Sequence, residues 1–128
     1  MEPTGIDHVV LTVEDVEATS AFYADVLGAE VVTFDGDRTA IRFGEQKINL
    51  HPAGDEFEPK AARPTPGAGD LCLTTGTPIA TVERELRGAD VEIVEGPVER
   101  TGAVGPITSV YVRDPDGNLV EIAAYRDG

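Results

Sequence analysis

The stretch IDHVVLTVEDVEATSAFYADVLG, residues 6–28, contains a complete strand and helix. Five of its first eight residues are Ile, Val or Leu, and the segment predicts a buried strand. Asp15 then stands at an N-cap position, and apolar residues recur near helical spacing until Gly28, where a C-cap belongs. Three short apolar segments follow, separated by turn residues: AEVVTF, RTAIRFG and QKINLH. Together these segments predict one βαβββ module over about residues 6–51.

The same order of elements repeats after a linker rich in Pro and Gly at 52–68. The second copy, at about 69–125, has a strand at DLCLTT and a helix that begins at Thr77 and Pro78 and ends at Gly88. Three more strands are predicted at VEIVEG (91–96), ITSVYVR (107–113) and NLVEIAAY (118–125), with ERTGAVGP (99–106) as a Gly-rich loop. Shifts of about 62 residues at the first strand and about 70 at the last align the copies. We therefore predict one α+β domain made of tandem βαβββ modules.

The charge of the chain is strongly acidic, with 24 Asp and Glu against 10 Lys and Arg, a formal net charge of −14. This balance argues against nucleic acid and anionic membranes as partners, since both attract basic surfaces. No apolar run is long enough to span a membrane, and residues 1–10 do not resemble a signal peptide. The single Cys72 favours a reducing, cytoplasmic setting. The dispersed acids and scarce Lys fit either a high-salt cytoplasm or an ordinary acidic protein.

Alternation along the strands places four polar side chains on the face away from the helices: His8, His51, Asp70 and Glu121. Two imidazoles with one or two carboxylates suit a divalent transition metal. Each residue also has a simpler interpretation, as a hydrogen-bonded strand histidine or a solvent-facing carboxylate. Cys72 shares this face, either lining a cavity or serving as a small buried hydrophobe.

The motifs IDHVVLTVEDVEATSAFYADVLG and VYVRDPDGNLVEI resemble the vicinal oxygen chelate superfamily, which contains glyoxalase I, fosfomycin- and bleomycin-resistance proteins and extradiol dioxygenases. FGEQKINLH, EFEPKA and GDLCLTT look most like the subfamily called glyoxalase domain-containing protein 5. The resemblance implies a cupped mixed sheet, or half-barrel, around one divalent metal ion (Mn, Ni, Zn, Fe or Co), often in a homodimer. His8 matches the opening ligand and Glu121 the closing one. His51 stands where glyoxalase I carries a Glu ligand, and Asp70 where it usually carries His.

The resemblance also implies an activity on a small-molecule substrate. The leading hypothesis is a metal-dependent lyase or isomerase that chelates two adjacent substrate oxygens and stabilises an enediolate, with Glu121 as the base. Arg113, Tyr111 and Lys47 point toward the cavity by strand alternation and are the candidate substrate-binding residues. The alternatives are a thiol transferase like the fosfomycin-resistance enzymes and a ligand-sequestering protein like the bleomycin-resistance proteins. Asp70 makes extradiol dioxygenation the least favoured, because those enzymes normally carry His there.

Overall fold

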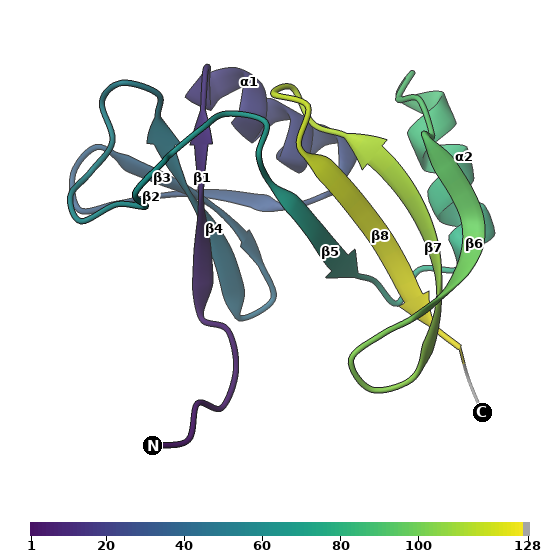
Figure 1. Ribbon diagram of the computed structural model, residues 1–128. Coiled ribbons are helices and arrows are strands. Elements are labelled where there is room, and N and C mark those ends of the chain that lie inside the picture. The colour runs from purple at the N-terminus through teal and green to yellow at the C-terminus, as the bar shows by residue number, and fades with distance from the viewer. Residues whose placement is uncertain (127–128) are drawn as a thin grey trace. The chain divides into compact units, whose positions relative to one another are not determined.

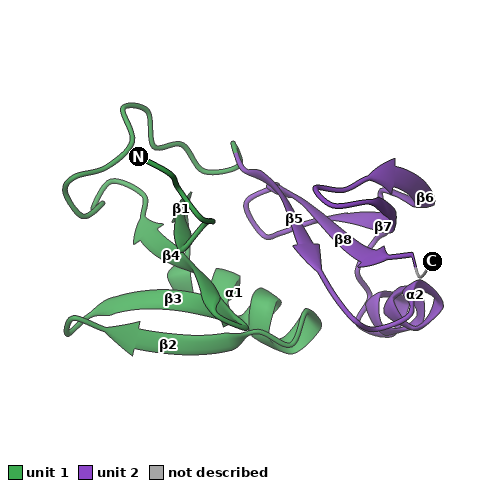
Figure 2. Ribbon diagram, turned by 90° about the horizontal axis from the view of Figure 1, so that it is seen from below, with its two compact units in different colours: residues 1–68 green, residues 69–128 purple. Residues whose placement is uncertain are grey.

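The computed structural model describes residues 1–126, which divide into a first unit of residues 1–68 and a second that begins at Gly69 (Figure 2). Each unit contains one four-stranded mixed sheet and its own helix. The predicted α+β class is therefore confirmed. Within residues 1–126, no helix is long and apolar enough to cross a membrane.

The first unit begins with β1 (His8–Val13), α1 (Val16–Ala21) and a π-helical turn, η1 (Phe22–Val26). It continues with β2 (Glu30–Phe34), β3 (Arg38–Phe43) and β4 (Gln46–Pro52), in the sheet order β1-β4-β3-β2. The Asp15 carboxylate accepts a hydrogen bond from the backbone N of Ala18 at 3.1 Å, which confirms the predicted N-cap. Helix α1 contacts β3 and β4. The core of the first unit includes the buried side chains of Val13, Tyr23, Ile41 and Leu50.

The second unit contains β5 (Asp70–Thr74), α2 (Ile79–Gly88), β6 (Glu95–Thr101), β7 (Pro106–Arg113) and β8 (Leu119–Tyr125). Its strand order, β5-β8-β7-β6, repeats that of the first unit (Figure 1). Helix α2 contacts β7 and buries Val82 and Leu86. The helix ends at Gly88 as predicted, but the N-cap residue is Pro78 and not Thr77.

Strand β6 differs from the prediction. Three of residues 91–94 are β-branched, as is common in a strand, yet the backbone N of Val91 donates to Leu86 O at 2.9 Å and closes the end of α2. The strand therefore begins at Glu95 and extends through Thr101, into the segment predicted to be a loop. A register irregularity lies between Glu95 and Val98, as expected of a β-bulge. Arg100 consequently belongs to a strand.

The strand registers fix how the two units correspond. His8 lies opposite Lys47 in the parallel pair of β1 and β4, and Asp70 lies opposite Leu119 in the pair of β5 and β8. His8 and Asp70 differ by 62 residues, as predicted, whereas Lys47 and Leu119 differ by 72. The predicted shift of 70 at the last strand is therefore wrong by two residues. The residue of the first unit that corresponds to Glu121 is Asn49, and His51 corresponds to Ala123.

Candidate functional site

A straight row of four side chains crosses the sheet of the second unit. The paired positions run from Cys72 on β5 to Glu121 on β8, Tyr111 on β7 and Glu95 on β6. Directly opposed residues on one face of a sheet lie close enough for their side chains to interact. The first three line a cavity of about 390 Å³, which is large enough for a small metabolite. Thr74, Arg100 and Tyr125 also line it.

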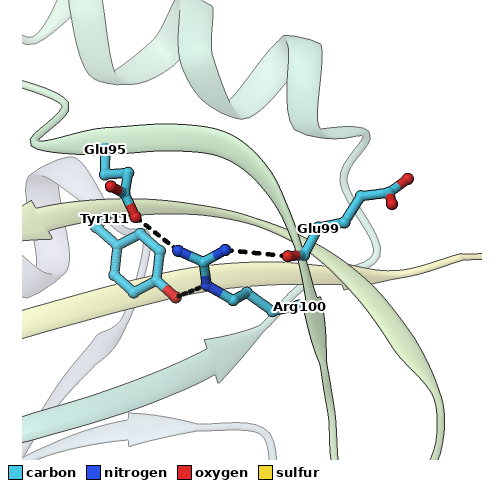
Figure 3. Close-up of polar contacts among 4 residues, drawn as sticks. All are labelled: Glu95, Glu99, Arg100 and Tyr111. Atoms are coloured by element: carbon cyan, nitrogen blue, oxygen red, sulfur yellow. Dashed lines mark hydrogen bonds and ion pairs between the residues drawn. The ribbon is translucent and has the colours of Figure 1, made fainter.

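Arg100 is fixed in place by hydrogen bonds from all three of its guanidinium nitrogens (Figure 3). Nε donates to the hydroxyl of Tyr111 at 3.0 Å, and Nη2 donates to the carboxylate of Glu95 at 2.6 Å. Nη1 donates to the backbone O of Glu99 at 3.1 Å, while the Glu99 side chain points away. That side chain pairs instead with Arg126, at 2.7 Å. The positive charge of Arg100 thus has an ion-pair partner, Glu95, on the same strand.

Glu121 stands between two groups that remain protonated at neutral pH. Partial burial, and then the charge of Glu121, raise the pKa of the Cys72 thiol to about 11. Burial also raises the pKa of Tyr111, the hydrogen bond from Arg100 opposes this, and the negative charge of Glu121 raises the pKa further. A protonated phenol opposite a carboxylate on a neighbouring strand can donate its hydrogen to it. Cys72 is therefore a neutral lining residue and not an activated nucleophile.

One wall of this cavity is the hairpin between β6 and β7. The hydroxyl of Tyr125 accepts a hydrogen bond from the backbone N of Val104 at 3.3 Å, and Gly102 N donates to Gly105 O at 2.8 Å. A Cβ atom on Gly102 would lie 2.8 Å from the Tyr125 hydroxyl oxygen. The absence of a side chain at Gly102 therefore lets Tyr125 approach the hairpin.

In the first unit, His8 is partly exposed at the start of β1. Its Nδ1 lies 2.8 Å from the Asp7 carboxylate. When a carboxylate accepts the Nδ1 hydrogen, the lone pair of Nε2 is left to bind a metal, which is the usual arrangement of metal-ligating histidines. His8 therefore has the local partner that a metal ligand requires.

His51 has different surroundings, since it is buried and contacts Arg38. The Arg38 Nη2 atom lies 3.3 Å from His51 Nε2, and the Arg38 guanidinium lies over the rings of Phe34 and Phe57, 5.0 and 4.6 Å from their centroids. Burial, and then the charge of Arg38, lower the pKa of His51 against an opposing effect of Glu56. Among residues 1–126, no group hydrogen-bonds to its Nδ1. The imidazole is therefore neutral, with Nε2 directed at a cation.

Asn49 is a second buried polar residue on the same face of β4, with 5% of its surface exposed. Its Oδ1 atom has no hydrogen-bond partner within residues 1–126. Along the parallel pair, Asn49 lies two residues beyond the position opposite His8, and His51 lies four beyond it. At a rise of about 3.3 Å per residue, these offsets are roughly 7 and roughly 13 Å along the strand. Asn49 is thus much nearer to His8 than His51 is.

The other predicted site residues lie as follows. Asp70 is exposed at the start of β5, and Arg113 is exposed and donates to the backbone O of Gly117 at 3.2 Å. Lys47 has its Nζ atom 3.6 Å from the ring centroid of Phe34. Of the predicted residues, only Tyr111 and Glu121 line the described cavity. Within residues 1–126, no three His, Cys, Asp or Glu side chains form a cluster that could hold a metal.

Three residues of interest were absent from the sequence prediction: Arg100, Tyr125 and Asn49. The alternation of NLVEIAAY carried the signal for Tyr125, which shares a face with Glu121. To predict Asn49 from the sequence, one would need the correct shift of 72 residues between the units. To predict Arg100, one would need to know that its segment is a strand.

The family model of the glyoxalase/bleomycin resistance protein/dioxygenase superfamily matches residues 5–122. This match spans most of the chain, which therefore belongs to that superfamily. Its sequence is 61% identical over 120 residues to the virulence protein STM3117 of Salmonella typhimurium, covering 94% of this chain and 83% of that protein. The crystal structure of STM3117 superposes with a TM-score of 0.97 at 59% identity, covering 98% of this chain and all of that chain.

Two further relatives carry glyoxalase names. The chain is 52% identical over 122 residues to the glyoxalase domain-containing protein RDO1 of Mycosarcoma maydis, covering 95% of this chain and 69% of that protein. The structure of lactoylglutathione lyase from Agrobacterium tumefaciens has a TM-score of 0.73 at 25% identity, covering 97% of this chain and 96% of that chain. The superfamily thus includes glyoxalase-type enzymes of the same fold.

Proposed function

We propose that the chain is a metal-dependent lyase or isomerase of glyoxalase type, acting on a small molecule with two adjacent oxygens. The observation that carries the proposal is the placement of Glu121 in the wall of a cavity, between a neutral thiol and a phenol on the neighbouring strands. A carboxylate in this position combines the properties of a metal ligand and a base. The likeness to lactoylglutathione lyase supports this class of reaction.

The side chains present fit a divalent ion in their chemistry. We propose His8, Asp70 and Glu121 as ligands of this ion. For the remaining donor we favour Asn49 over His51, because Asn49 occupies the position that corresponds to Glu121 and its buried oxygen has no partner within residues 1–126. The Nε2 atom of His51 faces Arg38, and a guanidinium and a metal ion cannot share one lone pair. His51 as a ligand stays a prediction that the experiment below tests.

A bound divalent ion supplies Lewis-acid stabilisation of charge on the two substrate oxygens. The protein side chains supply the proton transfer. We propose that Glu121 takes the proton from the carbon next to the substrate carbonyl and returns it to the neighbouring carbon. Tyr111 keeps the carboxylate oriented while its charge changes, and the neutral Cys72 and Thr74 shape the cavity without competing for the proton.

Thiol transfer to a phosphonate is less well supported. Such a reaction needs a cation free to bind the anionic group, and Arg100 is the only Arg or Lys that lines the described cavity. All three of its nitrogens already donate within the protein, and Glu95 balances its charge. The electrostatics therefore favour an uncharged carbonyl substrate over a dianion.

Calorimetric titration of chelated protein with Mn, Ni, Zn, Fe(II) and Co tests the metal requirement. His8→Ala and Glu121→Gln should weaken binding more than the 10–100-fold typical of residues that only orient a ligand. Asn49→Ala should weaken binding more than His51→Ala does, and the reverse order would return His51 to the ligand set. The loaded protein should then convert hemithioacetals formed from methylglyoxal and simple thiols, and Glu121→Gln should not.

A chelated wild-type protein that binds none of the five metals would refute the proposal. We also infer a homodimer, since proteins of this superfamily often dimerise. Light scattering at micromolar concentration in high salt tests this, and a monomer would contradict it.

A further inference from the structure

Glu121 has one neighbour able to hold its carboxylate in a fixed orientation. Cys72, on one side, is a weak donor, whereas Tyr111, directly opposite Glu121 on β7, carries a hydroxyl that can donate a hydrogen bond to it. A hydroxyl group carries a single hydrogen, so this bond forms only if the hydroxyl is turned toward Glu121. The orientation of Tyr111 therefore determines whether Glu121 is held.

Arg100 fixes the orientation of that hydroxyl. Its Nε–H occupies a lone pair of the Tyr111 oxygen at 3.0 Å, so the tyrosine cannot turn its own hydrogen toward the arginine. The guanidinium also lies near the Tyr111 ring, with Cζ 5.6 Å from the centroid. The bond from Nε therefore leaves the hydroxyl hydrogen free to be donated to Glu121, the residue opposite Tyr111 on β8.

Arg100 is itself held by β6 on the opposite side. Glu95, directly opposite Tyr111 in the register, accepts from Nη2 at 2.6 Å, and the backbone O of Glu99 accepts from Nη1. The register irregularity between Glu95 and Val98 lies in the strand segment between Glu95 and Arg100. The planar guanidinium matches this three-way arrangement, which a lysine ammonium cannot reproduce.

We propose that Glu95, Arg100 and Tyr111 form a support chain that holds the carboxylate of Glu121 in the orientation needed to bind the metal. The three are positioning residues, and the inference rests on the function proposed above for Glu121. Carboxylates that ligate metals are themselves hydrogen-bonded, and loss of such a partner typically costs 10–100-fold in affinity or activity.

Metal affinity measured in the absence of substrate provides a readout that does not depend on the proposed reaction. Tyr111→Phe removes only the hydroxyl and should weaken metal binding by about 10–100-fold. Arg100→Gln should weaken it by a smaller factor, because the phenol stays but its hydrogen is no longer directed. In the double variant the two losses of metal affinity should not add, since both substitutions interrupt the same support chain.

The sign of the Arg100 effect separates support from simple electrostatics. Removing a positive charge from an acidic protein strengthens its attraction for a cation, so Coulomb forces alone predict tighter binding. Arg126→Gln is the matched control, because Arg126 also pairs with a carboxylate of β6, that of Glu99, but does not line the cavity. It should bind metal as tightly as wild type or slightly more tightly. Arg100→Lys, which keeps the charge, should still weaken binding.

Urea unfolding of each variant shows whether the fold is retained. If Tyr111→Phe proves unstable, the metal affinity of Arg100→Lys alone tests the support chain. If the wild type binds metal and both Tyr111→Phe and Arg100→Lys bind it equally well, the support chain is refuted while the proposed function stands. If the wild type binds no metal, the proposed function fails and the role assigned to the chain fails with it.

Discussion

Substitution of Gly96 by alanine should destabilise the second unit strongly. Gly96 has φ +108°, a backbone conformation that residues with a side chain rarely adopt. A Cβ atom there would lie 2.5 Å from the backbone O of Ser109 and 3.0 Å from the Cα of Val110. Both contacts are with the backbone of β7, which cannot rotate away as a side chain would. The substitution therefore combines an unfavourable φ with a steric clash.

The contribution of the positive φ and that of the steric clash can be separated by experiment. Positive φ in a residue with a Cβ costs about 1–2 kcal/mol, and insertion of an extra carbon into a packed region costs about 1–3 kcal/mol. Gly96→Ala should thus lower the free energy of unfolding by roughly 2–5 kcal/mol. Gly36→Ala is the control, because Gly36 has φ +88° but no atom within 4 Å of an added Cβ, and it should lose only about 1–2 kcal/mol. Urea unfolding at equilibrium measures both, and equal losses would refute the steric argument.

Two further predictions concern pH and salt. Because burial and Arg38 lower the pKa of His51 below its usual 6.5, the unfolded chain binds more protons than the folded chain in mild acid. The free energy of unfolding of chelated protein should therefore fall as the pH drops through about 6.5, and His51→Gln should flatten this slope; parallel slopes would show that His51 does not contribute. Since a net charge of −14 repels itself, raising KCl from about 0.1 to about 2 M should raise the melting temperature, and a flat or falling value would contradict this.

Much of the fold was predictable because its signals are local. The Asp15 cap, the end of α2 at Gly88 and the strands around DPDGN each depend on a few adjacent residues, and the structure contains all of them. Strand β6 was not predictable in this way, because VEIVE has the β-branched composition of a strand yet follows directly from the end of a helix. The bulge after Glu95 then breaks the simple alternation through which Arg100 would have been assigned a face.

The residues of the candidate site were predictable only where the register between the strands was predictable. Alternation alone placed Tyr111 and Glu121 on one face, and both line the cavity. Asn49 and His51 share a face of β4 by the same alternation, but only the histidine was predicted as a ligand. The choice between them depends on a two-residue offset between distant strands, which a single sequence does not encode locally.

The register also explains why Asn49 and Glu121 have different surroundings. Asn49 lies between Val10 and Ala40, at the positions where Glu121 has Cys72 and Tyr111. The carboxylate of Glu121 thus has a hydroxyl group on the neighbouring strand, whereas the amide oxygen of Asn49 has apolar neighbours and no hydrogen-bond partner within residues 1–126. A buried polar atom without a hydrogen bond costs about 1–3 kcal/mol. Such a cost is expected where the buried atom serves to bind a ligand.

Asn49→Leu should therefore stabilise the chelated protein, by up to about 1–3 kcal/mol less any strain from the larger side chain. The same substitution should weaken metal binding, because it removes the oxygen. Asn49→Asp should do the opposite, since it buries a charge without a donor but offers the metal a stronger ligand. Urea unfolding and calorimetric titration on the same samples measure both quantities. If Asn49→Leu leaves metal affinity unchanged while stability rises, Asn49 is a packing defect with no role in binding, and the fourth donor must be sought elsewhere.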